Sequence, residues 1–249
     1  MDLWGIWESF LDIVYPMDVR CLVCKEKRQD TLSHGVCRMC EESLPFIEPP
    51  SCPKCGKMML ADDTLCSDCA RADHAFHKGL SVFEYGTEVK DLIYRYKYRG
   101  EKYLSNPMIH WMTRCLESCD WDFDVIVPVP LHPIRERQRG FNQADLLARG
   151  LSRNTGIPLM DKSLIRIRNT PQQARLSGHE RRRNLMGAFR IRESGKGPGK
   201  RPRAFEGRTV LLVDDVYTTG NTADQCSRVL LGAGAGRVYI ITLAIGSSL

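Results

Sequence analysis

Four Cys-x-x-Cys pairs fall within the first 70 residues and limit what this part of the chain can become. They are separated by 12, 11 and 10 residues, and the segment around them has no long apolar run from which to build a core. Two such pairs supply the four thiolates that tetrahedral zinc requires. The sequence therefore predicts a small double zinc-ribbon domain over residues 20–75, with two structural zinc sites. The predicted ligands are Cys21, Cys24, Cys37, Cys40, Cys52, Cys55, Cys66 and Cys69.

The spacing leaves the grouping of these pairs open. Sequential ribbons join the first pair to the second and the third to the fourth, whereas a cross-braced arrangement joins the first to the third. We favour sequential ribbons. Redox dithiols use the same spacing, but they come singly and beside a βαβ unit. Because four thiolates saturate zinc, the metal is predicted to be architectural or to build a docking surface. His34, His74 and His77 lie nearby and are interpreted as ordinary polar residues.

Residues 1–19 place Trp4, Trp7 and Leu11 at helical spacing and reach Pro16, which predicts a short amphipathic helix. We favour packing of this helix on its own protein over a membrane or partner helix. Its acidic residues and broken apolar run are not those of a signal peptide, so we interpret the protein as cytoplasmic. No run of about 18 apolar residues occurs, and no membrane span is predicted.

From residue 78 onward, strand and helix patterns alternate. Strands are predicted over 79–85, 124–129, 164–168, 210–213 and 237–244, and helices over 88–98, 104–116, 142–153 and 222–231. This alternation favours an α/β domain over residues 78–249, with a mostly parallel sheet flanked by helices. Two polar stretches interrupt the pattern, near 169–190 and 193–206, and are predicted to be mobile loops.

The strand over 210–213 leads into two carboxylates and then into a turn of small residues at a helix N-terminus. Such a turn directs backbone N–H groups at an anion, and threonine hydroxyls add further donors. Two adjacent carboxylates at the end of a buried strand are costly unless a ligand uses them, and a sugar diol beside a divalent cation would do so. The predicted phosphosugar site comprises Asp214, Asp215, Thr218, Thr219, Gly220, Asn221 and Thr222.

This segment, VLLVDDVYTTGNT over residues 210–222, resembles the signature of type I phosphoribosyltransferases that binds 5-phosphoribosyl 1-pyrophosphate (PRPP). The resemblance implies that Asp214 and Asp215 hold the ribose hydroxyls, that residues 218–222 hold the 5-phosphate, and that Mg²⁺ accompanies PRPP. In a reaction, the same carboxylates would stabilise an oxocarbenium-like transition state. Asn221 departs from the small residue usual at its position.

Cationic residues concentrate between positions 131 and 210, which hold 19 Lys or Arg and only 6 Asp or Glu. Such a surplus suits pyrophosphate or a nucleic-acid backbone, although surface arginines are often merely solvated. Residues 94–99 also alternate Tyr with Arg or Lys, a pattern that can stack bases, although an amphipathic helix with half-buried tyrosines looks the same. The candidate cations are Lys97, Arg99, Arg135, Arg137, Arg139, Arg175, Arg181, Arg182 and Arg183.

Four segments in this order resemble the ComF family of amidophosphoribosyltransferase-like competence proteins. They are YKYRGEKYLS (96–105), PVPLHPIRERQRGFNQADLLA (128–148), TPQQARLSGHERRRNLMGAF (170–189) and the PRPP turn. The resemblance covers nearly the whole chain, including the cysteine region, and implies a role in DNA uptake or in the use of DNA as a nutrient.

Three functions are consistent with these motifs. The first is a PRPP-binding factor that contacts single-stranded DNA and other DNA-uptake proteins. The second is an active phosphoribosyltransferase that transfers the phosphoribosyl group to an unidentified base or amine with release of pyrophosphate. The third is a regulator that senses PRPP without turnover. We favour the first as the biological role, and an enzyme over a pure binding protein.

Overall fold

The centre of the molecule is a four-stranded parallel sheet in the order β1-β6-β5-β2. In this computed structural model the described residues are 20–60, 64–169, 185–192 and 205–246. The strands are β1 (Lys78–Glu84), β2 (Val125–Pro128), β5 (Thr209–Tyr217) and β6 (Arg237–Ile245). The predicted parallel α/β sheet is confirmed, and its apolar strands are buried on both faces, as parallel sheets require.

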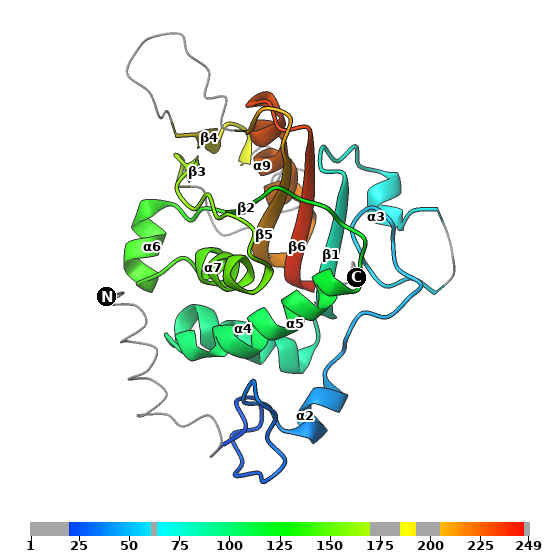
Figure 1. Ribbon diagram of the computed structural model, residues 1–249, viewed down its shortest axis with the longest axis vertical. Helices are drawn as coiled ribbons and strands as arrows, with labels where there is room; N and C mark the ends of the chain where they lie inside the picture. Colours follow the sequence, from blue (N-terminus) through cyan, green and yellow to red (C-terminus); the bar gives the residue numbers. More distant parts are fainter. Residues whose placement is uncertain (1–19, 61–63, 170–184, 193–204, 247–249) are drawn as a thin grey trace.

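Helices cover the two faces of this sheet (Figure 1). On one face lie α4 (Thr87–Tyr98), the 3₁₀ turn η1 (Lys102–Leu104), α5 (Ser105–Glu117) and α7 (Gln143–Thr155), and on the other lies α9 (Asn221–Gly232). Successive side chains of a strand point to opposite faces. Leu211 and Val213 of β5 accordingly pack with the first group, and Val210 and Leu212 with α9.

Strand β5 is longer than the sequence predicts. It continues beyond residue 213 to Tyr217, so Asp214 and Asp215 lie within the strand and not after it. Asp214 is paired with Thr242 of β6. The neighbouring strand β6 is apolar as far as Ile245. Its backbone continues to form hydrogen bonds with β5 in the part of β5 where the side chains become polar.

A two-stranded antiparallel pair stands apart from the parallel sheet. It consists of β3 (Leu164–Arg166) and β4 (Phe189–Ile191), and β4 lies against α9. The prediction of a loop reaching residue 190 is therefore wrong at its end, because buried Leu185 and Phe189 anchor this part of the chain to the core. The rest of both predicted loops and the predicted helix over 1–19 lie outside the described residues.

A short helix, α6 (Pro133–Arg139), lies between β2 and α7, outside the helices predicted from the sequence. Pro133 fits the first position of a helix, where no backbone N–H donor is needed. His132 caps the helix by accepting the N–H of Ile134 on Nδ1 at 3.3 Å. Gly140 ends it in the left-handed conformation. The helix carries the three arginines of this segment.

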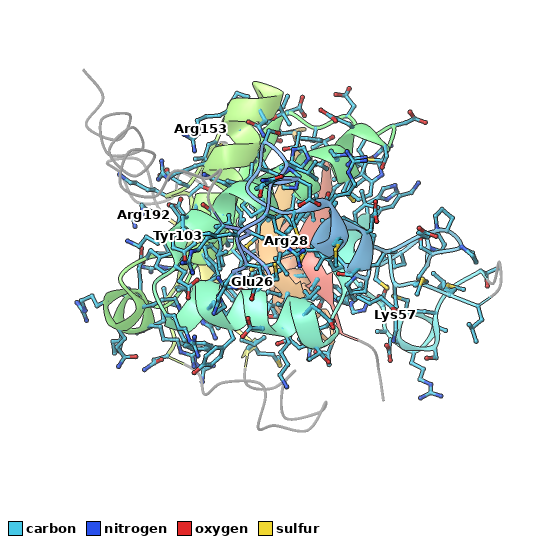
Figure 2. The ribbon with its side chains drawn as sticks, turned by 90° about the horizontal axis from the view of Figure 1, so that it is seen from below. Glu26, Arg28, Lys57, Tyr103, Arg153 and Arg192 are labelled. Carbon is cyan, nitrogen blue, oxygen red and sulfur yellow. The ribbon has the colours of Figure 1, made fainter. Side chains whose placement is uncertain are left out.

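The two cysteine-rich ribbons lie at different sites around the sheet (Figure 1). The first includes α2 (Arg38–Ser43), and its buried residues join the core formed by α4 and α5. The second includes α3 (Ser67–Ala70), and its residues join the core on the other face. Figure 2 shows Arg28 of the first ribbon over the middle of the molecule and Lys57 of the second toward one side.

The second ribbon lies against the backbone of β1. A Cβ atom on Gly56 would lie 2.7 Å from the carbonyl oxygen of Gly79, and the φ angle of Gly56 is +75°. Only glycine permits this contact. The ribbons are therefore packed into the domain at specific places. Within the described residues, no helix has the length and apolar character needed to cross a membrane.

Candidate functional site

The eight paired cysteines form two quartets in chain order. In each quartet the four Sγ atoms lie within 4.8 Å of one another. The first quartet is Cys21, Cys24, Cys37 and Cys40, and the second is Cys52, Cys55, Cys66 and Cys69. The predicted sequential grouping is confirmed, and the cross-braced alternative is excluded.

The donor sets fit structural zinc. With Zn–S bonds of about 2.3 Å, a tetrahedral ion separates its sulfur ligands by roughly 3.8 Å. The Sγ atoms of Cys55 and Cys66 are 3.7 Å apart. Six of the eight cysteines are buried, and each set offers thiols alone. Four thiolates leave no open position for a substrate, so these sites are structural.

Backbone N–H donors stabilise the thiolate form of the first cysteine in each quartet, which is the form that binds a metal. The N–H groups of Val23 and Cys37 donate to Sγ of Cys21 at 3.4 and 3.3 Å. The N–H of Cys66 donates to Sγ of Cys52 at 3.4 Å. Burial raises the pKa of Cys21 and Cys52, but these donors outweigh it and bring each pKa to about 7. Both thiols are therefore readily deprotonated near neutral pH.

The predicted phosphate turn joins β5 to the N-terminus of α9. Gly220 is the N-cap of that helix, with φ of 72°. A Cβ atom there would lie 2.3 Å from Oη of Tyr217, so both the backbone angle and the space demand glycine. The N–H groups at the start of α9 have no carbonyl partner within the helix, and the helix dipole is positive at this end. An anion placed at this turn would meet these unpaired N–H donors.

A pocket opens at this turn. Five of the predicted phosphosugar residues line it, together with apolar residues of β5 and β6 and with Val129, which follows β2. The five are Asp214, Thr218, Gly220, Asn221 and Thr222. Thr219 is outside the lining, but its Oγ1 is buried and has no hydrogen-bond partner among the described residues.

The two predicted carboxylates point to opposite faces of β5. Asp215 faces α4, and its Oδ2 lies 2.8 Å from Nζ of Lys97. Asp214 lines the pocket on the other face. The sequence predicts that both carboxylates bind the same ligand. In the structure, however, Asp215 is part of a largely buried ion pair. Lys97, a predicted cation, is thus joined to the strand that carries the site.

The Asp214 carboxyl has an unusual pKa. Burial and the negative charge of Asp215 raise the pKa of Asp214 to about 7. The N–H of Asp215, which donates to Oδ1 of Asp214 at 2.9 Å, and the charges of Lys97 and Arg166 act in the opposite direction. Asp214 therefore changes its protonation near neutral pH when no ligand is bound.

Arg166 is a residue of this region that sequence analysis did not single out. It ends β3, is only 8% exposed, and stacks its guanidinium 5.4 Å from the ring centroid of Phe189. Burial and the charge of Arg135 lower the pKa of Arg166, while Asp214 lies close enough to oppose this shift. The sequence feature that could have identified Arg166 is its inward-facing position in a predicted strand.

The predicted arginines of α6 differ in their surroundings. Arg135 lies near Arg139 and Arg166, and burial followed by the charge of Arg139 lowers its pKa. Arg139 has a buried Nη1 atom without a hydrogen-bond partner in the described part of the chain. Arg137 is exposed. The remaining candidates, Arg175, Arg181, Arg182 and Arg183, lie outside the described residues.

The alternating Tyr and cation pattern on α4 contains both a core residue and an exposed surface. Tyr96 is fully buried and donates its hydroxyl to the carbonyl of Gln143 at 2.9 Å. Tyr94 and Tyr98 are 50% and 54% exposed, with ring centroids 5.2 Å apart.

The guanidinium group of an arginine also lies over each exposed ring. Arg99 lies 5.9 Å from the centroid of Tyr94, and Arg139 lies 5.2 Å from that of Tyr98. We call Tyr94, Tyr98, Arg99 and Arg139 the tyrosine ladder. Arg139 connects this ladder to Arg135 and so to the cations near the pocket.

Comparisons with known proteins agree with this architecture. Residues 10–70 match the model of the double zinc ribbon domain, and residues 104–248 match that of the phosphoribosyl transferase domain. Competence protein F of Haemophilus influenzae is 29% identical over 230 residues, which cover 90% of this chain and 96% of that protein.

Two further relatives match over most of their length. DNA utilization protein YhgH of Escherichia coli is 30% identical over 226 residues, covering 88% of this chain and 94% of that protein. Competence protein ComFC of Bacillus subtilis is 31% identical over 217 residues, covering 84% and 83% respectively. With its two cysteine quartets, its parallel sheet and its β5–α9 turn, the chain belongs to the ComF family, in which a double zinc ribbon is joined to a phosphoribosyltransferase domain.

Proposed function

We propose that this protein binds PRPP with Mg²⁺ in the pocket at the end of β5 and acts in DNA uptake or utilisation. The observation that carries the proposal is the pocket itself, where Asp214 and the start of α9 face the same space. Backbone N–H groups and the hydroxyls of Thr218 and Thr222 would hold the 5-phosphate. Asp214 would accept the ribose hydroxyls. Bound Mg²⁺ would neutralise charge on the pyrophosphate.

The names of the relatives support the biological half of the proposal. They are called competence or DNA utilization proteins, and they match this chain across both the ribbons and the transferase domain. We infer that the tyrosine ladder contacts single-stranded DNA. Exposed aromatic rings stack unpaired bases, and arginines beside them bind the phosphates. Tyr94 and Tyr98 are adjacent, half-exposed and flanked by guanidinium groups.

Phosphoribosyl transfer is a second candidate activity for the same pocket. Arg166 lies near Asp214, Arg135 lies near Arg166, and the two arginines would bind the pyrophosphate that leaves. Transfer would break the bond between C1 of the ribose and pyrophosphate and form a bond from C1 to a base or amine, which loses a proton. Release of pyrophosphate in the presence of PRPP and a panel of bases and amines tests this activity. Binding without release would leave a sensor or a DNA-handling factor.

Calorimetric titration with PRPP and Mg²⁺ tests the binding site directly. The zinc-loaded protein should bind, and Asp214→Asn should weaken binding by about tenfold or more because a charged hydrogen bond to the ribose is lost. Asp120→Asn is the matched control, since Asp120 is exposed and far from β5 in the chain. Equal affinities of the three proteins, or no binding by the unaltered one, would refute the assignment.

A further inference from the structure

The second cysteine quartet lies directly behind the phosphate turn. Tyr217, at the end of β5, is buried in the same cluster as the four cysteines of that quartet. The ring of Phe76 lies 6.1 Å from that of Tyr217, at 90°, and 5.1 Å from Nζ of Lys54, which stands between Cys52 and Cys55. On its other side, Oη of Tyr217 fills the space where a Gly220 side chain would be. The side chain of Tyr217 thus connects the phosphate turn, through Phe76, to the second ribbon.

His74 supports the same turn from the segment that leaves the second ribbon. It is buried, and its Nε2 lies 3.4 Å from Oη of Tyr217. Its Cε1 atom would lie 2.9 Å from a Cβ on Gly220. Its ring stacks on Phe76, with centroids 4.8 Å apart and planes at 22°. His74 and Tyr217 therefore form a wall against Gly220, and His74 is more than the ordinary polar residue that the sequence indicates.

The same segment is bonded to the first turns of α9. The N–H of Ala75 donates to Oδ1 of Asp224 at 2.6 Å. Nη2 of Arg228 donates to the carbonyl of Asp73 at 3.0 Å. The segment is in turn attached to the quartet, because Lys54, between two of the cysteines, donates its ammonium to the carbonyl of Phe76. The second ribbon is therefore connected to both elements that flank the phosphate turn, namely the end of β5 and the start of α9.

The first ribbon makes a different set of contacts. Nη1 of Arg95 on α4 donates to the carbonyl of Leu22 at 2.9 Å. Nε1 of Trp111 on α5 donates to the carboxylate of Glu41 at 3.0 Å. These contacts anchor the first ribbon to helices on the face of the sheet opposite α9. The two ribbons thus support different parts of the domain.

We propose that the second zinc ribbon is a positioning element of the PRPP site, acting through His74 and Tyr217 on the turn at Gly220. Zinc held by the second quartet would fix this wall and, with it, the direction of the N–H groups at the start of α9. This inference rests on the proposed PRPP site. It adds a means of regulating that site, because metal occupancy of the second ribbon sets the affinity for PRPP.

Substitutions at His74 separate positioning from general stability. His74→Ala should weaken PRPP–Mg²⁺ binding about tenfold, since misdirected donors lose most of their bond strength. His74→Phe keeps the ring against Gly220 and Phe76 and should restore affinity to within about threefold. His77→Ala is the matched control, because His77 is exposed on the same segment and contacts Tyr239 instead. It should bind like the unaltered protein.

Hydrogen exchange gives a readout that does not need PRPP. Amides of residues 218–224 should exchange about tenfold faster in His74→Ala, while amides of α5 keep their protection. Cys66→Ser, checked for zinc content, should give the same local pattern. Unchanged exchange at the turn would overturn the inference, as would an equal increase throughout the domain. Faster exchange at the turn with no PRPP binding by the unaltered protein would instead refute the proposed function and retain the positioning role.

Discussion

Nζ of Lys97 and Oδ2 of Asp215 are 2.8 Å apart, with side chains 17% and 6% exposed. This pair ties α4 to β5 immediately beside the pocket. The neighbouring carboxylate, Asp214, has the opposite orientation and a pKa raised to about 7 by burial and by Asp215. Two acidic residues that are adjacent in the chain therefore have separate positions, since Asp215 joins helix to strand and Asp214 lines the pocket.

Asp214→Asn should stabilise the free protein in a pH-dependent way. The pKa of Asp214 is raised from 3.8 to about 7 on folding, so its carboxyl stabilises the fold below pH 4 and this stability is lost as pH rises through 7. The gap in melting temperature between Asp214→Asn and the unaltered protein should widen from pH 5.5 to 8. Thermal unfolding with excess zinc measures it. A constant gap would contradict the assignment.

Asp215→Asn should behave in the opposite sense. It leaves the ammonium of Lys97 largely buried without its carboxylate, and we expect a loss of about 2 kcal/mol in the free energy of unfolding. The double variant Lys97→Met/Asp215→Asn should recover most of that loss, because no charge is then buried alone. Urea unfolding of the four proteins in this cycle gives the coupling energy. Additive effects would show that the pair does not stabilise the fold.

The tyrosine ladder can be tested with oligothymidine. Tyr94→Ala/Tyr98→Ala should weaken binding by about 2 kcal/mol or more, since stacking contributes roughly 1–3 kcal/mol per base. Arg139→Gln should reduce the slope of log affinity against log salt by about one. Tyr85→Ala serves as the control, because Tyr85 is also exposed, at 37%, but lies beyond β1. Equal DNA affinity of the ladder variant and the control would place DNA elsewhere.

Gly220→Ala should damage the pocket more than its backbone angle alone explains. Gly220 and Gly100 have φ of +72° and +69°, but only Gly220 has atoms within 4 Å of a new Cβ. Gly100→Ala should cost about 1 kcal/mol for the left-handed conformation. Gly220→Ala should cost more and should lose PRPP binding. Calorimetry and thermal unfolding of the two variants make this comparison. Equal losses of stability would mean that the turn shifts enough to accommodate the new Cβ atom.

Removal of both zinc ions together, unlike loss of the second ion alone, should unfold the whole domain and not only the ribbons. Cysteines of both quartets belong to the cores on the two faces of the sheet. Treatment with a strong chelator should therefore remove the circular dichroism of the α/β domain in the same transition that releases metal. Retained helix signal after the loss of both zinc ions would show that the domain folds independently of them.

Much of the architecture follows from short-range sequence patterns. The spacing of the cysteine pairs predicted both quartets, and the strand-turn-helix around Gly220 predicted the pocket. The separation of Asp214 from Asp215 was missed because the apolar run ends at Val213, whereas the length of β5 is set by its neighbour β6. Alternation along a longer strand would have revealed it.

Contacts that depend on distant segments could not be predicted in this way. Nothing near His74 in the sequence indicates that Gly220 lies against its ring, because the two are brought together only by the packing of ribbon on sheet. Arg166 was overlooked for a similar reason: an arginine in a short strand is usually solvated, and its burial results from Phe189 on β4. No helix was predicted for α6 because Pro128, Pro130 and Pro133 are spaced as in a turn.

The pairing of β1 with β6 has a consequence for how the protein is made. Oγ of Ser81 and Oγ1 of Thr242 are 2.7 Å apart across a separation of 161 residues. On the ribosome, the first quartet can capture zinc once about 20 consecutive residues have emerged, since its ligands are close in sequence. The sheet must wait for β6, which lies between β1 and β5. Until then the nascent chain exposes strands without partners, and we expect it to depend on chaperones.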